Sequence, residues 1–180
     1  MSRVVLSLGS NLGDRMARLQ AAVDGLGGAV GTVSPVFETD AWGDTDQGPF
    51  LNAVVIAEDS RYDAGGWLRR AQELERDNQR VRTRRWGPRT LDVDLICCEQ
   101  TSPSGDCEVF SDTAELTLPH PLAHQRAFVL IPWLAADPDA TLTVGGRRRP
   151  VRELLEKLDR VERDGVRLTT QRLIAEKASP

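Results

Sequence analysis

Apolar residues follow two different periods along the first hundred positions of the chain. Four stretches are continuously apolar or alternate in polarity, as strands do: residues 4–8, 30–38, 50–57 and 91–98. Two others repeat apolar residues every three or four positions, as helices do: residues 12–26 and 63–78. The order strand, helix, strand, strand, helix, strand predicts a ferredoxin-like α+β fold, with helices packed on an antiparallel sheet.

The second half of the chain is less regular. Residues 99–115 are loop-like with a short strand at 107–110, residues 116–121 end a strand at two prolines, and residues 129–136 form a short helix. Residues 141–149 indicate a hairpin, and a final amphipathic helix is marked by Leu154, Leu155, Leu158 and Val161. We expect one domain over residues 1–165 and a partly ordered tail over residues 166–180.

Composition narrows the class of protein. The 180 residues are 40% hydrophobic and 28% charged, which is typical of one globular domain. A net charge of -4 argues against general nucleic-acid binding. The longest apolar run, residues 128–136, is too short for a membrane span, and no signal peptide is visible. Three cysteines cannot all pair, and the adjacent Cys97 and Cys98 follow an apolar run as buried thiols do. We expect a cytoplasmic monomer.

The stretch of residues 80–98 carries the strongest chemical signal. Five arginines and one tryptophan precede a strand on which Asp92 and Asp94 share one face, opposite three apolar residues. Same-face carboxylates on a strand lie ~6–7 Å apart, close enough to converge on a pair of divalent ions. Carboxylate-held cations that face guanidinium groups are typical of a polyphosphate site.

Other polar positions are weaker signals. Phe50 and Asn52 share a strand face, which suits either a bond to neighbouring backbone or a flat heteroaromatic ligand. The Gly9-Ser10 turn could hold phosphate or simply cap a helix. Gln72 and Glu75 fit a solvated helix face as well as a ligand site. His120, between two prolines, is held in a fixed loop.

Several motifs in order resemble the 6-hydroxymethyl-7,8-dihydropterin pyrophosphokinase family of the folate pathway. The most specific is the eleven-residue block of residues 86–96, WGPRTLDVDLI. Residues 8–12, 47–52, 80–82 and 118–121, followed by Arg126 and Phe128, complete the resemblance over most of the chain.

The resemblance implies a ferredoxin-like fold and transfer of pyrophosphate from ATP to the pterin hydroxymethyl group. Two Mg²⁺ ions would bind Asp92 and Asp94, while Arg80, Arg82 and Arg89 would hold the triphosphate. The residues implied for the pterin are Thr39, Ala41, Trp42, Phe50, Asn52, Trp86 and Phe128. Those implied for ATP are Leu68, Gln72, Glu75, Arg82, Arg89, Ile96, Thr117, His120 and Arg126. Attack at phosphorus depends mainly on positioning and electrostatics, so no general base is assigned, although either aspartate could take the proton.

The chain departs from the family pattern at a few positions. The arginine loop is one residue shorter than in the best-known bacterial member, and residues 99–113 are longer than the minimal loop. Asp40-Ala41 replaces the usual Pro-Pro, and the remaining differences are Trp42, Glu115 and Pro121. These positions concern pterin and adenosine contacts rather than the metal and phosphate centre.

Two other functions share some of these features. A nucleotidyltransferase also uses Gly-Ser and two aspartates, but there they lie close in sequence, whereas two strands and two helices separate Gly9-Ser10 from Asp92. An RNA-binding module on a ferredoxin-like sheet calls for exposed strand aromatics and a basic surface. The acidic balance and the aspartate pair favour the pyrophosphokinase.

Overall fold

The computed structural model describes residues 1–41, 46–78, 89–103 and 105–175. Its centre is an antiparallel sheet in which β1 (Ser2–Ser10) lies between β4 (Phe50–Asp59) and β5 (Asp92–Ser102). Both β2 (Val30–Val33) and β3 (Phe37–Thr39) pair with β4. The order β5, β1, β4 and then β2 with β3 is that of a ferredoxin-like sheet, and the predicted fold is confirmed.

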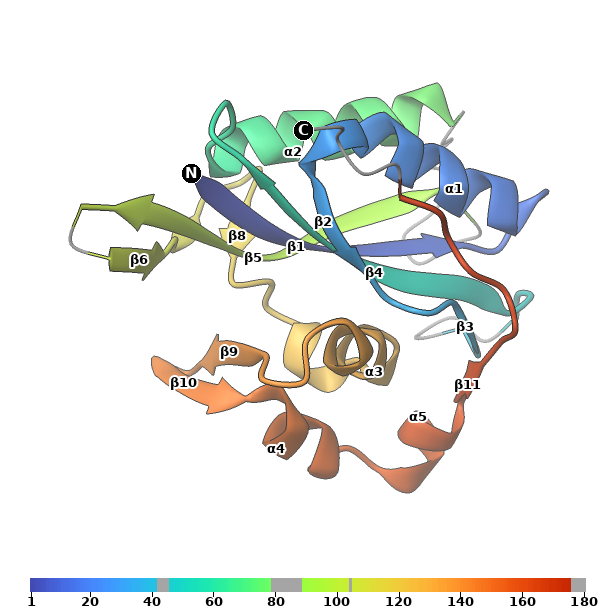
Figure 1. The fold of residues 1–180 in the computed structure, drawn as a ribbon. Coiled ribbons are helices and arrows are strands. Elements are labelled where there is room, and N and C mark those ends of the chain that lie inside the picture. The colour runs from blue at the N-terminus through green and yellow to red at the C-terminus, as the bar shows by residue number, and fades with distance from the viewer. Residues whose placement is uncertain (42–45, 79–88, 104, 176–180) are drawn as a thin grey trace.

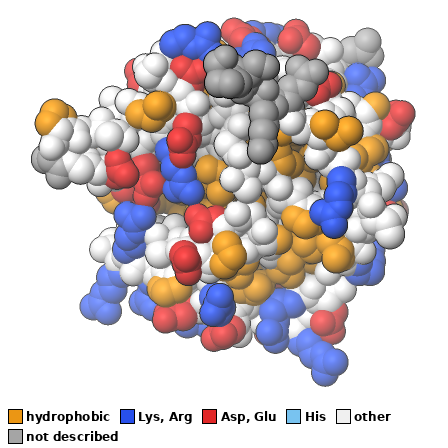
Figure 2. Space-filling model, in the orientation of Figure 1, with side chains coloured by type: hydrophobic (Ala, Val, Ile, Leu, Met, Phe, Trp, Pro, Cys, Tyr) orange, Lys and Arg blue, Asp and Glu red, His pale blue; other side chains and the backbone are white. Residues whose placement is uncertain are grey.

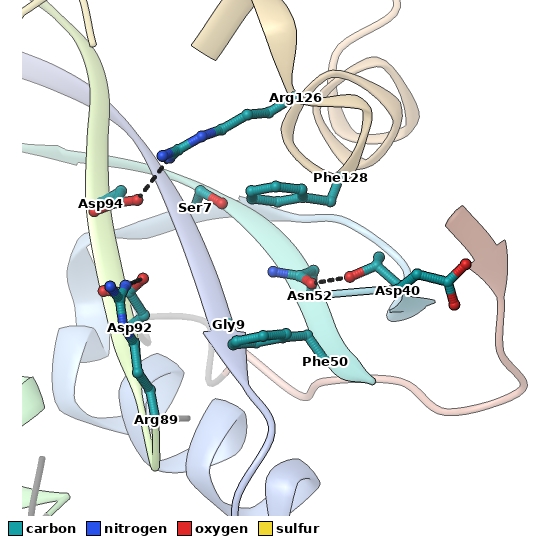
Figure 3. Close-up of a pocket in the computed structure, with 11 residues that line it drawn as sticks. Ser7, Gly9, Asp40, Phe50, Asn52, Arg89, Asp92, Asp94, Arg126 and Phe128 are labelled. Carbon is teal, nitrogen blue, oxygen red and sulfur yellow. Dashed lines mark hydrogen bonds and ion pairs between the residues drawn. The ribbon is translucent and has the colours of Figure 1, made fainter. Parts of the chain in front are cut away.

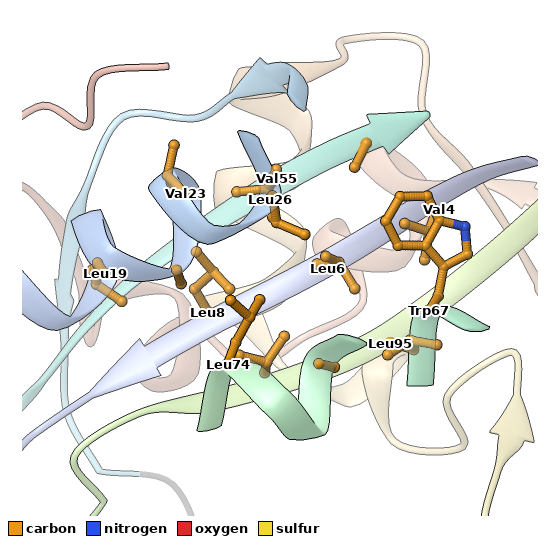
Figure 4. Packing of buried hydrophobic residues seen from close by; sticks show 14 of the residues in the cluster. Val4, Leu6, Leu8, Leu19, Val23, Leu26, Val55, Trp67, Leu74 and Leu95 are labelled. Atoms are coloured by element: carbon orange, nitrogen blue, oxygen red, sulfur yellow. The ribbon is translucent and has the colours of Figure 1, made fainter. Parts of the chain in front are cut away.

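Two helices cover one face of this sheet, α1 (Arg15–Leu26) and α2 (Ala64–Asp77) (Figure 1). Both begin at an aspartate whose carboxylate accepts a backbone N–H: Asp14 from Ala17 at 3.0 Å and Asp63 from Gly66 at 2.7 Å. Their apolar sides pack on alternate residues of the strands, as Figure 4 shows. The two predicted helices are therefore confirmed.

The second face of the sheet is covered by α3 (Ala127–Ala136) and the elements after it (Figure 1). The core there contains Val5, Val54 and Ile96 from the strands together with Val129, Leu130 and Trp133 from α3. A hairpin of β9 (Thr141–Val144) and β10 (Arg147–Pro150) follows, as predicted. Its turn uses Gly145 and Gly146, whose positive φ angles of 59° and 74° favour glycine.

Two expected elements differ in the structure. Strand 30–38 is divided into β2 and β3, because Ser34 leaves the ladder to bond Val54 through both its backbone and its hydroxyl group, and Pro35 has no N–H to donate. The final helix is divided into α4 (Val151–Glu156) and α5 (Arg160–Asp164). The side chain of Val161 is 84% exposed rather than packed. The sequence predicted one helix because its apolar residues keep a 3.6-residue period across the break between α4 and α5.

Residues 99–115 hold more strand than the sequence predicts. The end of β5 forms a hairpin with β6 (Gly105–Glu108), and β7 (Ser111–Asp112) pairs with β8 (Thr117–Leu118). The segment assigned to a tail contributes β11 (Val166–Leu168), which pairs with β3. Up to Ala175 this segment therefore belongs to the folded domain.

The cysteines are as the sequence predicts, with the adjacent pair buried and no disulfide among the three. Cys97 and Cys98 are buried, Cys107 is exposed, and all three are free thiols. Acidic and basic side chains both spread over the face drawn in Figure 2. Within the described ranges, no helix has the length and apolar character that crossing a membrane requires.

Candidate active site

A cleft that is partly open to solvent lies on the second face of the sheet beside the start of α3 (Figure 3). It is built by the end of β1, the start of β4, the start of β5, the end of β3 and the first turn of α3. The residues that line it are Ser7, Gly9, Thr39, Asp40, Phe50, Asn52, Arg89, Asp92, Asp94, Arg126 and Phe128.

Strand register sets the floor of the cleft. Gly9 of β1 pairs with Asn52 on one side and with Asp92 on the other. Neighbouring strands lie ~4.8 Å apart, so the backbones of Asn52 and Asp92 are ~10 Å apart across Gly9. Glycine leaves this middle position flat, since a Cβ built there would lie 2.8 Å from Asn52 Nδ2. A planar molecule therefore has room between an amide and a carboxylate.

Two aromatic rings form the walls above this floor. Figure 3 shows the rings of Phe128 and Phe50 on either side of Asn52. The Asn52 side chain is 4% exposed, accepts a hydrogen bond from Thr39 Oγ1 at 2.6 Å, and donates one to the Leu8 carbonyl at 3.2 Å. These bonds fix the orientation of the amide. Asn52 therefore bonds a backbone carbonyl group and also faces the cleft. The shared face predicted for Phe50 and Asn52 is confirmed.

Asp92 and Asp94 lie at the opposite end of the cleft, each paired with an arginine. Asp92 pairs with Arg89, and Asp94 Oδ2 lies 3.2 Å from Nη1 of Arg126. Leu91, Val93 and Leu95 point into the core under the helices, so the predicted division of the two strand faces is confirmed.

The electrostatics of this end depend on burial. Burial, reinforced by the negative charge of Asp92, raises the pKa of Asp94 to about 7 although Arg126 and Arg89 oppose the shift. Burial also lowers the pKa of Arg126, whose side chain is 5% exposed. The pair thus favours an arriving cation near Asp94 and an arriving anion near Arg126.

The structure gathers only some of the predicted nucleotide residues in the cleft. Arg89 and Arg126 line it, whereas Gln72 and Thr117 are exposed and Leu68 packs against the core beneath α2. Glu75 is buried and accepts a hydrogen bond from the Val93 N–H at 3.0 Å, which supports the backbone between the two aspartates.

His120 and Ile96 do not line the cleft: Ile96 is fully buried in the core, and His120 borders a separate hollow. The His120 N–H donates to the Ile96 carbonyl at 2.8 Å, and His120 Nδ1 accepts from the Leu122 N–H at 3.1 Å. Burial, with the nearby positive charge of Arg126, lowers the pKa of His120 to about 4. The ring is therefore neutral near pH 7, with its proton on Nε2.

Some predicted residues lie elsewhere, and some lining residues were not predicted. Arg80, Arg82, Trp42 and Trp86 are outside the described residues, and Ala41 borders a shallow hollow next to the cleft. Ser7 and Asp40 line the cleft without having been singled out as site residues. For Ser7 the signal was a small polar residue within an apolar strand, on the same face as Gly9.

Fold and site together define a ferredoxin-like enzyme whose cleft brings an aromatic slot up to a carboxylate and arginine cluster, an arrangement suited to phosphate-group transfer. The family model described as 7,8-dihydro-6-hydroxymethylpterin-pyrophosphokinase (HPPK) matches residues 5–138. The chain belongs to this family. Membership decides against both a nucleotidyltransferase and an RNA-binding module.

Similar proteins carry the same activity in their names. A 2-amino-4-hydroxy-6-hydroxymethyldihydropteridine pyrophosphokinase of Mycobacterium leprae is 60% identical over 182 residues, covering 100% of this chain and 95% of its own. That of Methylorubrum extorquens is 42% identical, with 88% and 95% covered. A Plasmodium falciparum HPPK-DHPS structure has a TM-score of 0.58 at 13% identity and supports the fold alone. It matches 87% of this chain, which spans 43% of that longer protein.

Proposed function

We propose that this cleft is where the reaction of the family takes place, with the pterin in the aromatic slot and the ATP phosphates at the aspartate end. The enzyme transfers pyrophosphate from ATP to the hydroxymethyl group of 6-hydroxymethyl-7,8-dihydropterin and releases AMP, a step of folate biosynthesis. The observation that carries the proposal is the row of Asn52, Gly9 and Asp92 across three strands.

The pterin ring would lie over Gly9, between Phe50 and Phe128, with its polar edge on Asn52. Offset stacking on one or two rings contributes about 0.5–1.5 kcal/mol each beyond the buried area. Thr39 acts through its 2.6 Å bond to Asn52. Ala41, Trp42 and Trp86 remain predicted pterin contacts from the resemblance.

Magnesium fits the donor set of the other end. The described residues contain no group of three or more His, Cys, Asp or Glu side chains arranged as a metal site. Mg²⁺ usually binds to one or two carboxylates and completes its octahedron with substrate phosphates and water. Two Mg²⁺ ions held by Asp92 and Asp94 in the presence of ATP would have this usual coordination. When bound, Mg²⁺ neutralises charge on the phosphate oxygens.

The two arginines would exchange partners when the substrates bind. Arg89 and Arg126 now neutralise the carboxylates that the cations would take. A triphosphate offers these guanidinium groups a bidentate anion of higher charge, so both can turn to the phosphates without leaving a buried charge unpaired. Arg80 and Arg82 are predicted to add to this clamp.

The transfer itself needs the hydroxymethyl oxygen in line with the attacked phosphorus. The slot fixes the ring and the arginines fix the phosphates, so the cleft supplies positioning and electrostatic stabilisation. No general base is assigned, because transfer of this type depends little on one. Leu68, Gln72, Glu75, Ile96, Thr117 and His120 remain predicted nucleotide contacts, and a monomeric state and a cytoplasmic location remain predictions of the sequence.

The test is to follow AMP with the pterin, ATP and Mg²⁺ together, and with each omitted in turn. AMP should appear only with all three. Asp94→Asn should lower kcat by about 1,000-fold or more, since several kcal/mol of charge stabilisation depends on the cation it holds. The matched control is Asp112→Asn on the exposed part of β7. Release of AMP without the pterin, or an Asp94→Asn variant of normal rate, would refute the proposal.

A further inference from the structure

The segment after α5 pairs with the strand that ends at the cleft. In the β11–β3 ladder, Val166 lies opposite Thr39 and Leu168 opposite Phe37. The pairing extends at both ends: the Asp40 N–H donates to the Gly165 carbonyl at 3.1 Å, and the Thr169 N–H donates to the Val36 carbonyl at 3.0 Å. β3 is only three residues long, so β11 supplies all the backbone partners along its outer edge.

A side-chain pair joins the same two segments. Arg167 Nη2 lies 2.9 Å from Asp40 Oδ1 and 3.8 Å from Glu38 Oε1. Asp40 lines the cleft, but Figure 3 shows its carboxylate pointing away from the aromatic slot, toward β11. Arg167 is 48% exposed and Asp40 69% exposed, so this pair alone has a modest effect.

The other end of the segment is anchored on the opposite layer of the fold. Gln20 of α1 makes two hydrogen bonds to the backbone of Ile174, at 2.7 and 2.9 Å. Leu173 and Ala175 pack against the core under α1. Figure 1 shows the segment passing from α5 along β3 and around the edge of the sheet to α1. Both ends are therefore fixed to the rigid domain.

We propose that residues 165–175 form a strap that positions the pterin-binding end of β3, with Arg167 as the positioning residue that holds Asp40. The inference rests on the proposed function of the slot. Thr39, the last residue of β3, must stay 2.6 Å from the Asn52 amide that reads the pterin edge. The strap holds the backbone on both sides of Thr39, at Val36 and at Asp40. The family-model match ends at residue 138, well before this segment.

The effect of the strap should appear in the pterin KM and not in the ATP KM. Arg167→Ala should raise the pterin KM about two- to fivefold, the range for an exposed ion pair, with the ATP KM unchanged. Arg167→Lys should restore much of the loss. The matched control is Arg160→Ala, which removes another surface arginine in an ion pair, with Asp164 on α5, where the Arg160 side chain is 86% exposed. Asp40→Asn combined with Arg167→Ala should be no worse than the stronger single variant.

Truncation after Gly165 is the stronger perturbation. It should raise the pterin KM at least tenfold and leave the ATP KM within twofold, with thermal unfolding measured alongside. If the truncated chain fails to fold, the point variants decide. The proposal would be refuted if Arg167→Ala and Arg160→Ala had equal pterin KM values. It would also be refuted if Arg167→Ala changed the KM values for the pterin and for ATP equally. A wild-type enzyme that does not use the pterin would instead refute the proposed function.

Discussion

Gly9→Ala is the sharpest perturbation of the floor of the proposed pterin slot. The added methyl group would lie 2.8 Å from Asn52 Nδ2 and 3.5 Å from Phe50 Cδ1, and ordinary contacts of a Cβ begin near 3.4 Å. The backbone φ of Gly9 is not among the positive values of the chain, so alanine can adopt it. The cost therefore falls on the neighbouring amide, which has to move by about 0.6 Å.

The magnitude follows from the bonds that this movement strains. Asn52 is held by Thr39 Oγ1 at 2.6 Å and by the Leu8 carbonyl at 3.2 Å. Weakening both, at about 0.5–1.5 kcal/mol each, costs about 1–3 kcal/mol of stability. The same displacement misplaces the amide against the pterin, so we expect pterin affinity to fall by about 5- to 150-fold. ATP affinity should be unchanged, because Arg89 and Arg126 are held by Asp92 and Asp94 on β5, whereas the displaced amide lies on β4.

Calorimetric titration with the pterin and with ATP would measure both affinities, and denaturant unfolding would measure stability. Gly65→Ala is the matched control: its Cβ meets nothing closer than 3.5 Å, and in α2 alanine should be neutral or stabilise by about 0.5–1 kcal/mol. The reasoning is refuted if Gly9→Ala binds the pterin as the wild type does, or if it weakens ATP equally.

Three other predictions concern single side chains around the site. Phe128→Ala should raise the pterin KM by about 10- to 100-fold through lost stacking and buried area, while Phe128→Leu should recover part of it; unchanged kinetics would exclude the slot. The pKa of His120 is about 4 in the folded protein, below its ordinary value of 6.5. As pH falls from 6.5 to 4, the unfolded chain therefore takes up a proton that the folded protein does not, and the free energy of unfolding decreases. We expect a decrease of about 1–2 kcal/mol after allowance for the partial exposure of the ring. Denaturant unfolding of His120→Gln at pH 7.5 and pH 4.5 should show a smaller loss than the wild type, and an equal loss would contradict the shift. Trp67→Phe should cost about 1–3 kcal/mol of unfolding free energy, because it deletes the 2.9 Å bond from Nε1 to Ser2 Oγ and leaves a cavity; a variant within 0.5 kcal/mol of wild type would contradict this.

The central elements could be predicted because their signals are local. A period of two places Asp92 and Asp94 on one face whatever the strand later pairs with, and a period of 3.6 does the same for α2. The shared face of Phe50 and Asn52 follows from the same rule. These patterns located the two chemical ends of the cleft without any knowledge of the fold.

The strand register and the contacts between residues far apart in the sequence could not be predicted from such local patterns. The row of Asn52, Gly9 and Asp92 depends on two ladders, and the pair of Arg126 with Asp94 joins positions 32 residues apart. Glu75 fitted a solvated helix face equally well, and only packing of α2 on β5 buries it against Val93. β11 has three residues, two of them exposed, so its sequence carries almost no strand pattern.

The position of the cleft follows from the dimensions of the elements that cover the sheet. β1 has nine residues and is ~30 Å long, whereas a helix is only ~10 Å across. Figure 1 views α3 nearly along its axis while the strands run across the picture, so α3 crosses the strands and shields the part of the second face that holds Val5 and Ile96. The strand ends beyond its first turn stay open. Apolar residues there would be exposed, and the chain instead has Ser7 and Gly9 on β1 beside two aspartates on β5, so the uncovered part of the sheet is the part proposed here as the reactive one.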